Sequence, residues 1–182
     1  MMMTAVKPDV DKARIAYNLI EVYGAQLGGY DTEGSVRIPP EDLVVKVLSD
    51  YLLGERRDPR FVEALFAVVT RKDFDWRKLH QLAAKADIGN RVHWLIRDFG
   101  LALDAEGLTE EAGRVRGGLP LFQSYRVPLE DALASEKPYR RRNVLSFASP
   151  AARDCGVPVV YDQDSLRKRA DLNCRSAYAN RS

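Results

Sequence analysis

The chain has 182 residues, of which 46% are hydrophobic and 30% charged, and its net charge at pH 7 is +2. This length suits one domain with a true hydrophobic core, with or without an appendage, and the charge balance points to no class of partner. Two cysteines are too few for a disulfide framework, and no apolar run approaches the roughly 20 residues that cross a bilayer. We therefore expect a cytoplasmic protein without a membrane segment.

Five segments before residue 100 place apolar residues at the spacing of one helix face, with prolines, acidic residues or glycines at their ends. They are residues 9–27, 39–54, 56–73, 73–87 and 90–100. Short links between consecutive helices favour antiparallel packing. The sequence therefore predicts a mainly α-helical fold, with an antiparallel helical domain over residues 1–105.

Local signals also predict where some helices begin. Asp58 precedes Pro59, a pair typical of a helix N-cap followed by the first helical position. Thr109 is a candidate cap for a short helix within residues 107–118. Asp162 and Asp164 are expected to form a turn and to cap the next helix.

Beyond residue 105 the periodicity weakens. The apolar, proline-bounded segments 119–127 and 157–161 favour short strands or extended chain, and residues 128–138 favour a short helix. Residues 165–182 have few large apolar groups and predict either a docked helix or a frayed end. We expect residues 106–182 to be an irregular, basic C-terminal extension.

Charge is distributed unevenly along the chain. Residues 1–136 hold 18 Lys and Arg against 22 Asp and Glu, whereas residues 137–182 hold 10 against 4. The sharpest cluster is "EKPYRRRNV", in which three arginines follow an aromatic ring suited to stacking. The basic residues predicted to contact nucleic-acid phosphates, and the tyrosine beside them, are Tyr139, Arg140, Arg141, Arg142, Arg167, Lys168 and Arg169. The alternative is a solvated loop or a docking site for an acidic protein face.

Residues 82–100, "LAAKADIGNRVHWLIRDFG", resemble the helix-turn-helix of bacterial regulators, and residues 100–115 look like the segment that comes after this motif in some winged-helix proteins. In this resemblance Ala83 lies at the helix crossing, Asp87 adopts the left-handed turn conformation, and Ile88 is the buried residue of the turn. The resemblance implies that the second helix presents Asn90, Arg91, Trp94 and Arg97 to the major groove. The alternative is a helix pair inside a bundle, with Trp94 in a core or interface.

Three departures from the helix-turn-helix pattern favour that alternative. The usual turn glycine is Asp87, the usually buried position of the second helix is His93, and Asp98 would repel phosphates. A broader similarity, carried by "RRDPRFVEALFAVV", "DFDWRKLHQLAA" and "NRVHWLI", links the chain to helical regions of prokaryotic toxin–antitoxin-associated proteins.

No set of acids, bases and nucleophiles converges in the sequence, and neither histidine has a partner at metal-ligand spacing, so we expect no enzymatic activity, metal or cofactor. The sequence predicts a prokaryotic regulator or accessory protein that contacts DNA or RNA through a basic surface. The alternative function is a protein–protein adaptor or antitoxin-like partner that does not bind nucleic acid.

Overall fold

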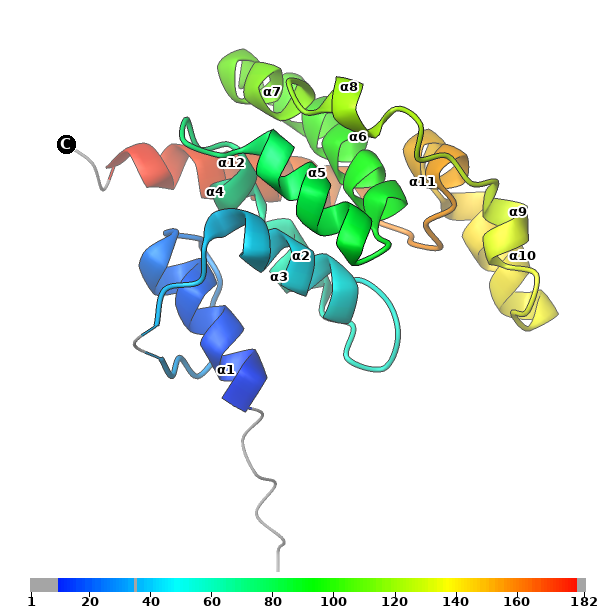
Figure 1. The fold of residues 1–182 in the computed structure, drawn as a ribbon, viewed down its shortest axis with the longest axis horizontal. Helices are drawn as coiled ribbons and strands as arrows, with labels where there is room; N and C mark the ends of the chain where they lie inside the picture. Colours follow the sequence, from blue (N-terminus) through cyan, green and yellow to red (C-terminus); the bar gives the residue numbers. More distant parts are fainter. Residues whose placement is uncertain (1–9, 35, 180–182) are drawn as a thin grey trace, which may run out of the picture.

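A computed structural model describes residues 10–34 and 36–179, and within this part of the chain every regular element is a helix. The predicted mainly α-helical fold is confirmed (Figure 1). The elements of the first half are α1 (Val10–Tyr17), the π-helical turn η1 (Asn18–Val22), α2 (Pro40–Asp50), α3 (Pro59–Ala64), α4 (Phe66–Val69) and α5 (Trp76–Lys85). Those of the second half are α6 (Gly89–Ala105), α7 (Thr109–Arg116), α8 (Leu119–Phe122), α9 (Leu129–Ala132), α10 (Pro138–Phe147), α11 (Pro150–Cys155) and α12 (Gln163–Ala179).

The first predicted helix is shorter than expected: α1 passes into η1 at the buried Asn18, and η1 ends at Val22. Asn18 Nδ2 donates to the carbonyl oxygens of Arg14, at 3.0 Å, and Val36, at 3.2 Å. Its Oδ1 accepts from the backbone N–H of Ile38 at 2.7 Å. One side chain therefore fixes the loop that leads into α2, and the helical ladder changes to η1 at this residue.

Helix starts agree with the predicted caps where an aspartate is present. Asp58 accepts from the N–H of Arg60 at the start of α3, as predicted. Asp162 accepts from the N–H groups of Asp164 and Ser165 at the start of α12, so the predicted cap at Asp162 is confirmed, whereas Asp164 lies inside the helix as its second residue. Thr109 is the first residue of α7 and makes no capping hydrogen bond, so that prediction was wrong.

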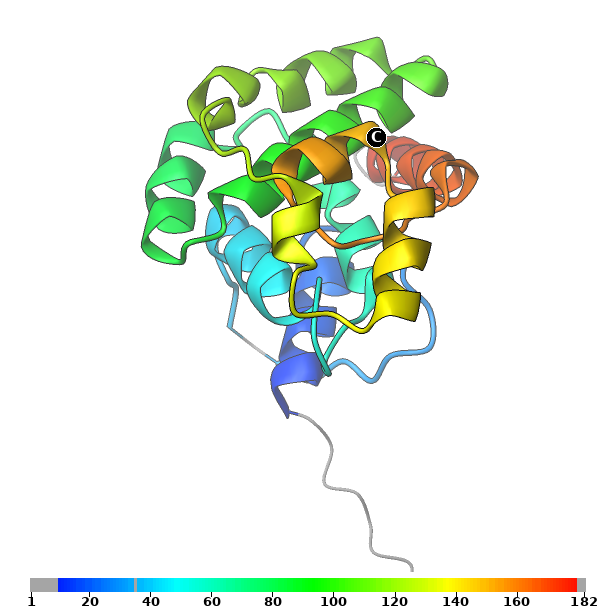
Figure 2. The ribbon, with the colours of Figure 1, turned by 90° about the vertical axis from the view of Figure 1, so that its right-hand side faces the viewer.

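The C-terminal part is more helical than the sequence predicted. The short strands expected in residues 119–127 and 157–161 do not form. The former contains α8 followed by irregular chain, and the latter is irregular between α11 and α12. These runs are apolar because they cover the core, as the buried Phe122, Val157 and Val159 show. Figure 1 shows α9, α10 and α11 together at one end of the molecule, and in Figure 2 this end faces the viewer.

A single hydrophobic core extends from Ile15 to Cys174. At its centre the rings of Phe66 and Phe99 stack with their centroids 3.8 Å apart. Helix α12 packs against α3, α4 and α6, and it buries Leu166 and Ala170. The predicted boundary at residue 105 therefore falls within a continuous core.

Candidate nucleic-acid interface

The turn between α5 and α6 has the local geometry that the sequence predicted. Asp87 has φ of 54°, in the left-handed region that few residues other than glycine adopt. Ala83 is completely buried on α5, and Ile88 is 3% exposed. A helix, a tight turn and a second helix are thus present.

The second helix of this pair, α6, is the central helix of the fold. It contacts α5, α7, α8, α11 and α12. Five consecutive residues, 92–96, are buried, so core contacts cover more than one face of the helix. A recognition helix needs an exposed face to enter a major groove. This arrangement favours the bundle interpretation of the pair.

The first two predicted contact residues of α6 bind backbone groups of neighbouring elements. Asn90 Nδ2 donates to the carbonyl oxygen of Cys155 at 3.1 Å. Arg91 Nη1 donates to the carbonyl oxygens of Leu48 and Ser49, at 2.7 and 3.2 Å. These carbonyls belong to the last turn of α2 and have no acceptor role within that helix, so Arg91 caps it.

The other two predicted contact residues are also engaged inside the protein. Trp94 is fully buried, and its Nε1 donates to Asp98 Oδ2 at 2.7 Å. Arg97 Nη1 lies 2.7 Å from Asp154 Oδ2, and only 28% of the Arg97 side chain is exposed. In this conformation Trp94 cannot contact a base, and Arg97 already has a carboxylate partner.

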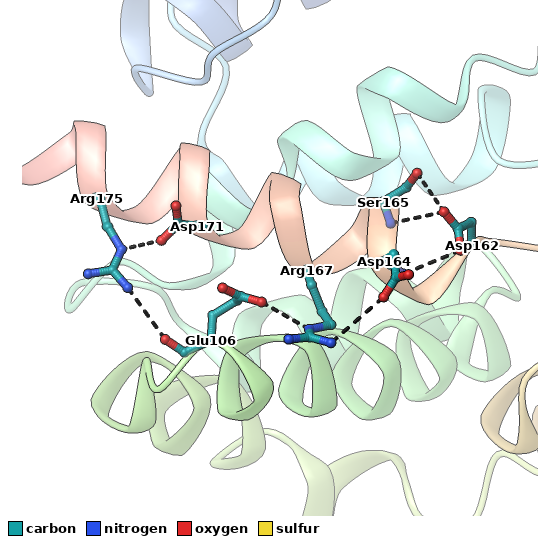
Figure 3. Close-up of polar contacts among 7 residues, drawn as sticks. All are labelled: Glu106, Asp162, Asp164, Ser165, Arg167, Asp171 and Arg175. Atoms are coloured by element: carbon teal, nitrogen blue, oxygen red, sulfur yellow. Dashed lines mark hydrogen bonds and ion pairs between the residues drawn. The ribbon is translucent and has the colours of Figure 1, made fainter.

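The predicted basic residues of α12 differ from one another in their surroundings. Arg167 Nε lies 2.9 Å from Glu106 Oε1 and also faces Asp164 (Figure 3). Arg169 Nε lies 3.1 Å from Glu63 Oε2. Lys168 is exposed and has no carboxylate partner within the described ranges. The two arginines thus hold α12 against the end of α6 and against α3, and their charges are compensated locally.

The cluster on α10 is the one that remains open to solvent. Tyr139 is 84% exposed, and Arg140, Arg141 and Arg142 are exposed as well. Arg140 lies 3.5 Å from Glu136. Within residues 10–34 and 36–179, Arg141 and Arg142 have no carboxylate partner. The chain therefore presents two uncompensated guanidinium groups beside an exposed aromatic ring.

The three arginine charges lie at the end of α10 where a positive charge does not stabilise a helix. The first half of a helix carries a partial positive charge, which favours acidic residues and disfavours cations. Here residues 140–142 are three adjacent arginines in the first half, and the first turn has no acidic residue. Among the residues of α10, all described, only Val144 is buried. The three arginine side chains thus take no part in the buried packing of α10.

Sequence reasoning missed two residues of this surface. Lys137 immediately precedes α10 and is exposed, and Phe147 at its end is 67% exposed. Lys137 belongs to the same run of basic residues, so the charge pattern could have identified it. Phe147 carried no such signal, because an apolar residue at the end of a helix is usually buried.

The described residues show neither a metal-ion cluster nor an activated cysteine. They contain no group of three His, Cys, Asp or Glu side chains placed to hold a metal ion. Burial raises the pKa of both cysteine thiols, Cys155 and Cys174, to about 11, which disfavours the reactive thiolate. No helix among these residues has the length and apolar character needed to cross a membrane.

Comparison of this chain with protein-family models, with curated proteins and with solved structures gave no match.

Proposed function

We propose that the protein is a non-enzymatic regulator or accessory protein that contacts nucleic acid through α10. The observation that carries the proposal is the exposed cluster of Lys137, Tyr139, Arg140, Arg141 and Arg142, in which two guanidinium groups have no carboxylate partner among the described residues. One guanidinium group can donate two parallel hydrogen bonds to the oxygens of a phosphate, and an exposed tyrosine ring can stack on an unpaired base. The four residues of α6 are left out of this interface because they hold the fold together.

Contacts of this kind are to phosphates, so they favour affinity without strong sequence preference. Each neutralised phosphate releases counterions, and the logarithm of the binding constant falls by about 0.9 per contact for each logarithmic unit of salt. Three or four contacts therefore predict a loss of about 40- to 150-fold in affinity between 50 and 200 mM salt.

The test is a fluorescence-anisotropy titration of the full chain against labelled duplex DNA, single-stranded DNA and single-stranded RNA at those two salt concentrations. We expect measurable binding at 50 mM salt and, for duplex DNA, the stated loss at 200 mM, with a smaller loss for the single strands because their slope is about 0.7 per contact. Tighter binding of the single strands would indicate stacking on Tyr139. No binding of any of these nucleic acids at 50 mM salt would overturn the proposal.

A second candidate function, docking on an acidic protein face, is favoured by Phe147. This ring is 67% exposed on the same helix as the arginines, and interfaces between proteins are enriched in arginine and aromatic residues. An adaptor would bind its partner through α10 and leave all three nucleic acids unbound.

A further inference from the structure

A cavity of about 470 Å³ lies between the start of α6, the chain around residues 124–127, and the link from α11 to α12. Its volume falls in the range of small-molecule sites. The proposed interface on α10 contributes no residue to its lining. The cavity is therefore a separate feature of the molecule.

Chain segments that pack closely at two glycines form the walls of the cavity. A Cβ atom on Gly89 would lie 2.3 Å from the ring of Tyr125. Gly156 has φ of +62°, and a Cβ atom there would lie 2.6 Å from the carbonyl oxygen of Val127. Both contacts require glycine, so the elements around the cavity meet in one closely defined arrangement.

Two cationic side chains line the cavity. Arg91 uses Nη1 to cap α2, while its Nε and Nη2 have no hydrogen-bond partner within the part of the chain that the structure describes. Arg126 is exposed and has no hydrogen-bond or carboxylate partner through its side chain among those residues. Burial lowers the pKa of Arg91, as expected for a charge that is only partly compensated.

The lining also contains one carboxylate and an apolar part. Asp87 is an exposed carboxylate, so the two guanidinium groups outnumber it. Leu53, Val127, Val157 and Pro158 supply apolar surface. A ligand that matches these groups has an anionic head and an apolar body.

We propose that this cavity binds a small organic molecule with a phosphate or carboxylate group, which Arg91 and Arg126 hold while its apolar part lies against Val127, Val157 and Pro158. An oxyanion suits two guanidinium groups, because each can donate paired hydrogen bonds. This assignment does not depend on nucleic-acid binding.

The test is isothermal titration calorimetry of the full chain with phenyl phosphate, benzoate and benzyl alcohol as probes. Phenyl phosphate or benzoate should bind saturably, and the tighter of the two identifies the preferred head group. Benzyl alcohol, which has the same ring and no charge, should bind at least about tenfold more weakly, because it lacks the charge-assisted hydrogen bonds. Equal binding of the alcohol, or no binding of either anion at about 10 mM, would overturn the proposal.

Two variants locate the binding. Arg126→Gln removes an exposed guanidinium group that makes no side-chain hydrogen bond or ion pair among the described residues, so the fold should persist, and affinity for the anion should fall about tenfold. Arg77→Gln removes a matched exposed cation on α5, outside the cavity, and should leave the affinity unchanged. If Arg126→Gln binds the anion as tightly as the unmodified chain, the assignment is wrong.

Discussion

At the scale of single residues, the carboxyl of Asp98 is a buried polar group that connects two helices. It is 1% exposed, and its Oδ2 accepts from Trp94 Nε1 and from Ser149 Oγ, both at 2.7 Å. Its Oδ1 has no hydrogen-bond partner among the described residues. Ser149 Oγ also accepts from the N–H of Ala152 and so caps α11. One buried carboxyl thus joins α6 to the start of α11.

Burial raises the pKa of Asp98 above its ordinary value of 3.8, while the hydrogen bonds from Ser149 and Trp94 oppose that rise. The folded protein therefore binds more protons at this group than the unfolded chain does above about pH 4, and the free energy of unfolding falls as pH rises through that range. Each excess proton contributes a slope of at most about 1.4 kcal/mol per pH unit.

We predict that Asp98→Asn removes this part of the pH dependence. Urea unfolding of both chains from about pH 4.5 to about pH 8 should show a flatter profile for the variant, whatever its absolute stability. Asp131→Asn, an exposed change on α9, is the control and should leave the profile unaltered. Identical slopes for Asp98→Asn and the unmodified chain would show that the Asp98 carboxyl does not titrate in this way.

Local signals at single residues were predictable from the sequence, whereas this network was not. The conformation of Asp87 and the caps at Asp58 and Asp162 depend on neighbours a few residues away, and all three predictions were confirmed. One of the two partners of Asp98, in contrast, is Ser149, which is 51 residues distant. Only the packing of α11 on α6 brings Ser149 to that carboxyl.

At the scale of elements, α6 shows how tertiary contacts change what a segment does. The sequence predicted that the fifth helix spans residues 90–100, but α6 continues to Ala105. At Gly100 the side chain of Arg116 on α7 lies against the backbone of α6, and Arg116 Nη2 donates to the Gly100 carbonyl oxygen at 3.4 Å. A glycine that signals a helix end in sequence here allows close packing of two helices.

The role of Arg91 as a cap of α2 gives a second prediction. Arg91→Ala leaves the carbonyl oxygens of Leu48 and Ser49 without this donor, and should lower the free energy of unfolding by about 1–3 kcal/mol. Nucleic-acid binding of the folded variant should stay unchanged. Arg77→Ala, an exposed change on α5, serves as the control for loss of an arginine and should cost less than about 0.5 kcal/mol. A variant with full stability and impaired binding would restore the helix-turn-helix interpretation.

At the scale of the whole molecule, the C-terminal helix completes the fold. Asn173 of α12 accepts through Oδ1 from the N–H of Gln26 at 2.8 Å, and Arg169 pairs with Glu63 of α3. The sequence predicted either a docked helix or a frayed end, and the structure shows a docked helix over its described residues. Leu166, Ala170 and Cys174 are spaced four residues apart and lie on one face of α12. Three such residues are a weak helix signal in the sequence, but all three are buried in the core.

We therefore predict that a shortened chain ending at residue 162 loses cooperative unfolding, because the faces of α3, α4 and α6 that α12 covers would be exposed to water. Within the full chain, Leu166→Ala should lower stability by about 2–5 kcal/mol. Exposed Lys168→Ala is the matched control on the same helix and should change stability little. If the shortened chain unfolds as cooperatively as the full chain, residues 1–162 form a domain that does not need α12.

The central claim is that α10, and not α6, contacts nucleic acid, and two matched variants test it most directly. Arg141→Gln and Arg97→Gln each remove one guanidinium group, the first exposed on α10 and the second paired with Asp154. In anisotropy titrations across a range of salt concentrations, Arg141→Gln should weaken binding to all nucleic-acid sequences and reduce the salt slope by about 1. Arg97→Gln should leave affinity and slope unchanged. Loss of binding in Arg97→Gln, with full binding in Arg141→Gln, would contradict the account.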